Sequence, residues 1–174
     1  MRHFIRAVAV LGLLYLLVLS LTASSLNWIP ADQRESVDLS TPVLRTLEGE
    51  EVKLSDLDAK VLLVNFWATW CGPCRKEMPD LERLQKALAD EGLQVVALSD
   101  DDPQAVRDYL KKNPYDFRFV IDKKGDLYNR MGFPGGVLPA SMVVDSQGRV
   151  ALVHVGLYDW DAPEVVESLR ALAR

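Results

Sequence analysis

Two cysteines three positions apart are the residues of this sequence best suited to do chemistry. They stand in the segment Trp70-Cys71-Gly72-Pro73-Cys74, and the chain of 174 residues has no other cysteine. Such a pair can be a redox couple, half of a metal site, or an accident. A zinc site needs two further ligands, but the chain has only two histidines, and His3 stands just before an apolar N-terminal run. A c-type haem attachment needs a histidine directly after the second cysteine, where this chain has Arg75. The favoured chemistry is therefore thiol–disulfide exchange, with no metal.

The place of the pair in the chain indicates how its thiols would work. An apolar run over 61–66 predicts a buried strand, and Pro73 begins a segment of helical spacing that Gly92 ends. A helix N-terminus stabilises a thiolate through its partial positive charge and its free N–H groups. Cys71, just before the helix, is therefore predicted to be the exposed nucleophile. Cys74, one turn further in, is predicted to resolve the mixed disulfide.

The surrounding segments predict alternating strands and helices. A hairpin is expected over 43–54, a second buried strand over 93–98 and a helix after Asp102. Two strands, 140–144 and 150–155, flank a turn, and an amphipathic helix ends the chain. This order predicts a thioredoxin-like α/β fold, with a central mixed β-sheet flanked by helices and an N-terminal β-hairpin extension.

The N-terminus has the layout of an export signal, because basic residues precede an apolar run over 7–23. We expect a signal anchor or signal peptide over 1–23, a tether over 24–42 and the thioredoxin-like domain over 43–174. An uncleaved anchor with its basic end in the cytoplasm is favoured, although a weak cleavage site at Ala23 leaves cleavage open. The net charge of -5 and the pI near 5.1 argue against a nucleic-acid partner.

The segment 61–79 resembles the active-site segment of the TlpA/ResA-like thioredoxins, which are membrane-tethered thiol–disulfide oxidoreductases of the bacterial cell envelope. The similarity continues more loosely through 54–57, 99–103 and 143–149. It implies a periplasmic domain, anchored in the inner membrane by residues 7–23, that reduces disulfides in exported proteins. Many members serve cytochrome c maturation or copper-site assembly and are recharged by a membrane electron carrier of the DsbD/CcdA type. The resemblance implies no cofactor beyond the redox-active Cys71–Cys74 disulfide.

The resemblance also implies a proton acceptor for Cys74. Asn65 stands where cytoplasmic thioredoxins have a buried aspartate, so the usual carboxylate is missing. Glu77 can take its place, because partial burial would raise its pKa towards a useful range. The alternative is that Glu77 is a solvated charge on the helix surface.

Substrate contacts are expected beside the nucleophile and at a second segment. Trp70, Gly72 and Pro73 flank Cys71 and are expected to touch the substrate. The resemblance implies a cis peptide bond before Pro139, facing the cysteine pair, with Leu138 binding substrate through its backbone. Leu138 is bulkier than its counterparts and the segment 132–139 is longer, so the identity of the substrate does not carry over.

Other residues and readings are less distinctive. We expect no chemical role for His154 in its strand, and we interpret Asp100, Asp101 and Asp102 as a solvated helix entrance. The pair Gly72-Pro73 favours a reductase, with an oxidase or isomerase left open. A copper(I) chaperone on the same fold is the alternative from another functional class. A structural domain with an inert cysteine pair is the third possible function.

Overall fold

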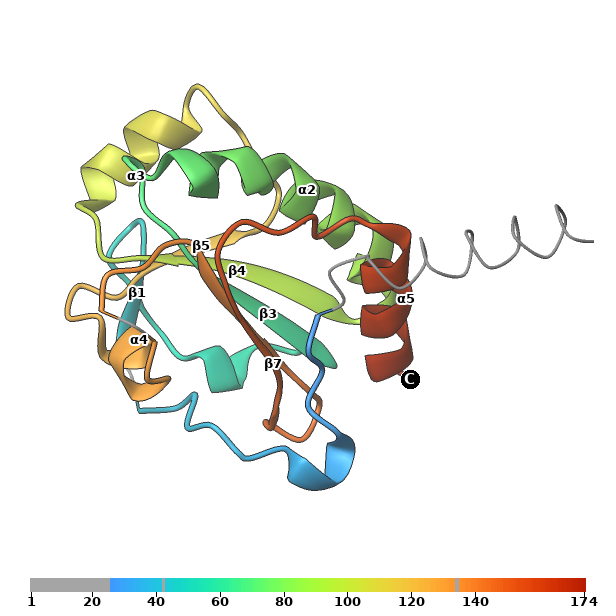
Figure 1. Ribbon diagram of the computed structural model, residues 1–174. Helices are drawn as coiled ribbons and strands as arrows, with labels where there is room; N and C mark the ends of the chain where they lie inside the picture. Colours follow the sequence, from blue (N-terminus) through green and yellow to red (C-terminus); the bar gives the residue numbers. More distant parts are fainter. Residues whose placement is uncertain (1–25, 42, 134) are drawn as a thin grey trace, which may run out of the picture.

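The computed structural model describes residues 26–41, 43–133 and 135–174. The strand β3 (Val61–Phe66) lies inside the sheet, and its six residues are all buried, as expected for a strand covered on both faces. β3 pairs in parallel with β4 and antiparallel with β6, which makes the sheet mixed. The described strands form one sheet in the order β2-β1-β5-β4-β3-β6-β7 (Figure 1). The other strands are β1 (Leu44–Thr46), β2 (Glu51–Val52), β4 (Leu93–Ser99), β5 (Arg118–Ile121), β6 (Ala140–Val144) and β7 (Val150–Val155).

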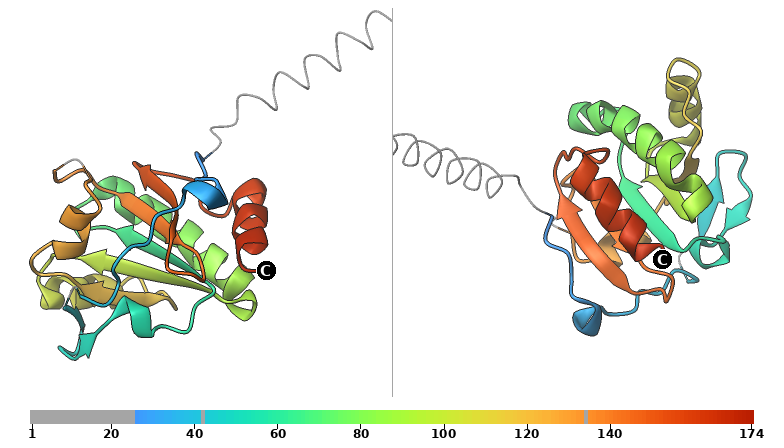
Figure 2. Two further views of the ribbon diagram at one scale, coloured as in Figure 1. Left: turned by 90° about the horizontal axis from the view of Figure 1, so that it is seen from below. Right: turned by 90° about the vertical axis from the view of Figure 1, so that its right-hand side faces the viewer.

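Helices cover both faces of this sheet. α2 (Gly72–Leu88) and α5 (Pro163–Leu172) lie side by side on one face, as the right-hand view of Figure 2 shows, and α3 (Pro103–Leu110) packs into the same core. α4 (Asp126–Arg130) contributes to the core of the opposite face. Three short 3-10 segments complete the described elements: η1 (Ala31–Gln33), η2 (Leu54–Asp56) and η3 (Ala89–Glu91).

The predicted fold class is confirmed, including the hairpin extension. β1 and β2 pair antiparallel, and β1 continues the sheet by pairing with β5. Gly49 lies in the connection between β1 and β2 with a φ of +94°, a conformation that glycine adopts without steric cost.

Residues 26–41 pack against the domain, the first part of them along β7. Leu26 is 9% exposed and belongs to the core beneath α2 and α5. The Ile29 N–H donates to the carbonyl of Ala151 over 2.8 Å, and Ser36 forms a β-bridge with Arg149. Residues 26–36 thus follow the free edge of the sheet, and the chain then crosses to η2, where the Leu39 carbonyl accepts the Ser55 N–H over 3.3 Å (Figure 1). The division of the chain at residue 42 stays a prediction.

The expected signal segment 1–23 lies outside the described residues. Among the residues that the structure describes, no helix combines the length and the apolar character needed to span a membrane.

Candidate active site

The two cysteines form a disulfide at the start of α2. Cys71 is the N-cap residue, and its Sγ accepts a hydrogen bond from the Cys74 N–H over 3.2 Å. The two sulfur atoms are 2.03 Å apart. After reduction, the same N–H and the helix dipole would favour a thiolate on Cys71. The expected place of the pair, between β3 and the helix, is confirmed.

Cys71 differs from the prediction in its exposure. It was expected to be exposed, but only 4% of its surface is accessible, and Cys74 is 0% exposed. The reason is geometric, because the disulfide ties Cys71 to a completely buried partner and both belong to the core beneath α2. The exposed residue of this segment is Trp70, with 69% of its surface accessible.

The peptide bond between Leu138 and Pro139 is cis, as the resemblance implied. β6 begins at the next residue, and the Pro139 carbonyl accepts a hydrogen bond from the Gly156 N–H over 2.8 Å. This bond ties the cis segment to the end of β7. Substrate binding by Leu138 and Pro139 stays a prediction.

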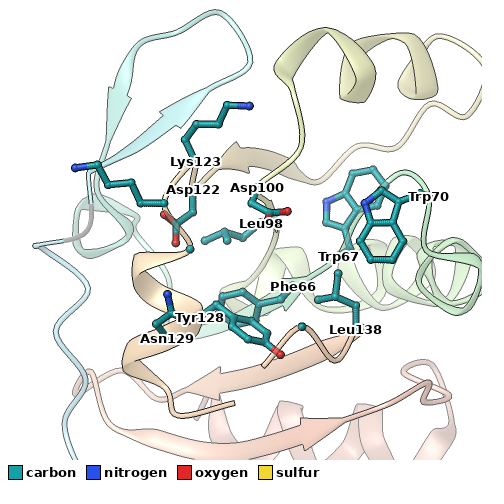
Figure 3. A pocket seen from close by; sticks show the side chains of 13 residues that line it. Phe66, Trp67, Trp70, Leu98, Asp100, Asp122, Lys123, Tyr128, Asn129 and Leu138 are labelled. Atoms are coloured by element: carbon teal, nitrogen blue, oxygen red, sulfur yellow. The ribbon is translucent and has the colours of Figure 1, made fainter. Parts of the chain in front are cut away.

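A pocket of about 300 Å³ is lined by Trp70, the residue before Cys71, but by neither cysteine (Figure 3). Trp70 and Leu138 lie at one end of it and Lys123 at the other. Its apolar lining includes Phe66 and Tyr128, whose rings meet edge to face with their centroids 5.5 Å apart. The pocket is therefore lined both by Trp70, which precedes Cys71, and by Leu138, which precedes the cis-proline. Neither Gly72 nor Pro73 lines it, and Gly72 borders a separate hollow with residues of α2 and α3.

Glu77 is fully buried, so its interpretation as a solvated helix charge is wrong. The Asn65 side-chain amide donates to its Oε1 over 2.6 Å, and the Tyr158 N–H donates to its Oε2 over 3.2 Å. Among the described residues, no arginine, lysine or histidine forms an ion pair with it. Burial raises the pKa of Glu77 to about 7, and the hydrogen bonds oppose that rise without cancelling it.

The placement of Glu77 suits proton exchange with Cys74. Both are buried on α2, and residues three positions apart are neighbours on a helix surface. A carboxyl group with a pKa near 7 can accept a proton and release it again at neutral pH. The structure thus brings a disulfide, a helix N-terminus and a titratable carboxyl group together.

Comparison with known proteins identifies the family. The AhpC/TSA family model matches residues 34–153, which is more than half of the chain. The chain belongs to the AhpC/TSA family. It is 41% identical to the thioredoxin-like protein YneN of Bacillus subtilis, over 65% of this chain and 66% of that one. It is 35% identical to the thiol-disulfide oxidoreductase ResA of Bacillus cereus, over 66% of this chain and 65% of that one. The matched regions thus span slightly less than two thirds of both relatives.

A solved structure supports the same placement. A protein from Chlorobium tepidum, described as a thiol:disulfide interchange protein DsbE, is 32% identical and superposes with a TM-score of 0.67. The superposition covers 80% of this chain and 100% of that one. The chain is therefore a TlpA/ResA-like thioredoxin within the AhpC/TSA family, as the active-site segment suggested.

The sequence interpretation missed one residue that positions the active-site loop, because it treated Asp101 as part of a solvated helix entrance. Asp102 caps α3 as expected, by accepting a hydrogen bond from the Gln104 N–H over 2.8 Å. Asp101, however, accepts the Thr69 N–H over 2.6 Å and so holds the loop that presents Trp70 and Cys71. Asp101 follows the carboxyl end of β4, next to β3 in the sheet. That placement was the available signal, since adjacent parallel strands end at the same edge.

Proposed function

We propose that this protein is an extracytoplasmic thiol–disulfide oxidoreductase that reduces disulfides in exported proteins. The observation that carries the proposal is the Cys71–Cys74 disulfide at a helix N-terminus, one turn from the buried carboxyl group of Glu77, which has no ion-pair partner among the described residues. An inert structural disulfide would have no need of a titratable neighbour. The names of the relatives, thiol-disulfide oxidoreductase and thiol:disulfide interchange protein, describe this class of reaction.

The proposed reaction uses the arrangement of Cys71, Cys74 and Glu77. In the reduced protein, the Cys71 thiolate attacks a client disulfide, forms a mixed disulfide and expels one client thiolate, which takes a proton from solvent. Cys74 gives its proton to Glu77 and, as a thiolate, attacks Sγ of Cys71. The second client thiolate leaves, and two electrons have moved from the cysteine pair to the client. No cofactor beyond the disulfide takes part in this scheme.

Clients are proposed to lie across the exposed Trp70 and the cis-proline segment. The residues beside the attacked client cysteine would then reach the pocket between Trp70, Leu138 and Tyr128. Gly72 and Pro73 would contact the client only at the sulfur atom that bonds to Cys71.

The cellular setting is part of the same proposal. Residues 7–23 would anchor the protein in the inner membrane with the domain in the periplasm, and a membrane carrier of the DsbD/CcdA type would supply electrons. Cytochrome c maturation and copper-site assembly are the candidate client pathways. The copper(I) chaperone alternative gains no support from Met78, the methionine nearest in sequence to the pair, because it is buried in the core.

Paired cysteine variants test the proposal. Cys71→Ser should lower the rate of glutathione-disulfide reduction by about 10³-fold or more, because it removes the nucleophile. Cys74→Ser should instead accumulate mixed disulfides on Cys71, visible by non-reducing electrophoresis and mass spectrometry. If Cys74→Ser traps no partner from the cell envelope, the assignment of the resolving cysteine is wrong.

The direction of electron flow needs a separate measurement. Acid quenching of intact cells, followed by thiol alkylation, gives the fraction of Cys71 and Cys74 that is reduced. A mostly reduced pair is expected for a reductase with a working electron supply. If the cysteine pair stays oxidised in cells that contain a membrane electron carrier of the DsbD/CcdA type, the reductase proposal is contradicted.

A further inference from the structure

We propose that His154 carries a proton from Glu77 to the protein surface. This proton is the one that Glu77 takes from Cys74. The inference rests on the proposed function, in which Glu77 is the base for Cys74. Because Glu77 is 0% exposed, its proton needs a path to solvent after every turnover.

The first observation is a row of polar residues across three strands. Asn65 on β3 lies directly opposite Ser141 on β6, and Ser141 lies directly opposite His154 on β7. Directly opposite residues of antiparallel strands project to the same face of a sheet. Asn65 donates to Glu77 of α2 over 2.6 Å and to the Ser141 hydroxyl oxygen over 3.0 Å, so this face is the one that α2 covers. The row leads from Glu77 to the edge strand.

The second observation is a loop that touches both Glu77 and His154. Tyr158 donates its backbone N–H to Glu77 Oε2, and its ring centroid lies 4.9 Å from that of His154. Trp160 is completely buried, with its ring centroid 6.2 Å from that of His154. Its indole also favours the charged form of Glu77, although the N–H is outside ordinary hydrogen-bond geometry. The carboxyl group and the imidazole therefore flank the same short loop.

The third observation is a set of buried polar atoms. His154 Nε2, Asn65 Oδ1 and Trp160 Nε1 are buried without a hydrogen-bond partner among the described residues. They offer acceptors and a donor, the combination that an ordered water molecule needs to join two groups. The His154 residue as a whole is half-buried, and it stands on β7, the edge strand of the sheet.

Burial shifts the pKa values of both Glu77 and His154. Burial lowers the pKa of His154, while the carbonyl groups of Leu157 and Gly156 oppose that change. Burial raises the pKa of Glu77, and the charge of Asp80 adds to the rise. The Tyr158 phenol is the titratable group against His154, and Glu164 and Asp159 act on that phenol. The pKa of Glu77, about 7, thus lies above the lowered pKa of His154, so transfer to the imidazole is uphill and is drawn forward by release of the proton to solvent.

The step is balanced as follows. Cys74 loses its proton to the Glu77 carboxylate, and the resulting thiolate attacks Cys71 Sγ. Neutral Glu77 then passes that proton to His154 Nε2 through an ordered water molecule held by these buried polar atoms, and it returns to a carboxylate. The imidazolium releases the proton to solvent at the β7 edge. His154 acts on the reaction through Glu77 and does not touch the client.

Single-turnover kinetics of the full-length protein tests this assignment. Reduced protein is mixed with excess oxidised glutathione, and decay of the Cys71–glutathione mixed disulfide is followed by acid quenching from pH 5 to 9. His154→Gln should slow this decay about tenfold at pH 7, less than the roughly 10²-fold expected for Glu77→Gln, which removes the base itself. Imidazole added to His154→Ala should restore the rate. Val153→Gln, on the same strand but with its side chain on the opposite face, is the matched control and should decay at the wild-type rate.

The possible outcomes separate the relay from the proposed function. A relay predicts that the double variant Glu77→Gln/His154→Gln decays no more slowly than Glu77→Gln alone. If Glu77→Gln slows the decay but His154→Gln does not, the relay is wrong and the proposed function stands. A slow His154→Gln protein that imidazole does not rescue, and whose defect adds to that of Glu77→Gln, would show a structural role instead. An unchanged rate in Glu77→Gln would overturn the assignment of the base and the relay with it.

Discussion

Glu77 and Asp145 are both buried carboxylates, and the chain surrounds them in opposite ways. Glu77 receives hydrogen bonds from a neutral amide and a backbone N–H, and no cation of the described residues pairs with it. Burial therefore dominates and raises its pKa to about 7. At neutral pH this group is close to half protonated.

Asp145, at the turn between β6 and β7, forms ion pairs and backbone hydrogen bonds. Arg149 and Arg34 reach its Oδ2 over 2.9 and 3.1 Å, and the backbone N–H groups of Gln147 and Arg149 donate to its Oδ1 over 3.0 Å each. Burial alone would raise the pKa of Asp145, but the hydrogen bonds from Arg149 and Arg34 lower it overall. This carboxylate stays charged throughout the neutral range.

The difference separates a structural carboxylate from a chemical one. Two guanidinium groups fix the charge of Asp145, which in return joins the 26–41 segment to the β6–β7 turn. Glu77 lacks such compensation, so its charge costs stability, and that cost is what makes it exchange protons near pH 7. Burial alone thus does not indicate function, whereas burial without a counter-charge does.

The pH dependence of stability gives the largest expected contrast. The folded pKa of Glu77 is raised from 4.5 to about 7, so its contribution to stability is complete below pH 4.5 and is lost as the pH rises through about 7. The loss is about 3 kcal/mol, since each pKa unit corresponds to roughly 1.4 kcal/mol. We expect urea unfolding of the oxidised protein to show this decrease between pH 5 and pH 8, and Glu77→Gln to remove most of it. Equal pH slopes in the two proteins would contradict the raised pKa.

Asp145→Asn is expected to destabilise the protein by about 2 kcal/mol at pH 7 without slowing disulfide exchange. The estimate lies below the roughly 3–5 kcal/mol of a fully buried broken pair, because the side chains of Arg34 and Arg149 keep 15% and 28% of their surface exposed. The pKa of Asp145 is lowered, so its contribution is present above pH 3.8 and is lost as the pH falls through the folded value. Urea unfolding at pH 7 and at pH 3 measures both effects. A variant as stable as the wild type, or one with slower exchange, would remove the distinction between the two carboxylates.

The features that the sequence predicted correctly are those encoded locally. Three such features are the apolar run of β3, Pro73 at the helix start and the spacing of Cys71 and Cys74. Each depends on only a few neighbouring residues, so the sequence pattern was enough to predict it. The cis bond before Pro139 came from the family resemblance, since sequence alone gives a cis bond only a small prior.

What the sequence could not give depends on segments that meet only in the folded chain. Glu77 is covered by the Tyr158 backbone, 81 positions away, and the Thr69 loop is held by Asp101, 32 positions away. His154 gains its place from its two neighbours in the sheet and from the loop that follows it. The exposure of Cys71 was misjudged for the same reason, because the burial of its disulfide partner decides it.

The smallest expected effect tests the 26–41 segment through Arg34. Its guanidinium binds Asp145 and also donates to the Ile29 carbonyl over 3.0 Å. Arg34→Ala should therefore cost about 1 kcal/mol in urea unfolding at pH 7, the loss of a partly buried charged hydrogen-bond network. Arg45→Ala is the matched control, because Arg45 pairs with Glu51 at a site where both side chains are more than half exposed, and it should change stability by no more than about 0.5 kcal/mol. Because Asp145 keeps Arg149 as a partner, Arg34→Ala should cost less than Asp145→Asn. Equal losses from Arg34→Ala and Arg45→Ala would mean that the 26–41 segment adds nothing to the stability of the Asp145 site.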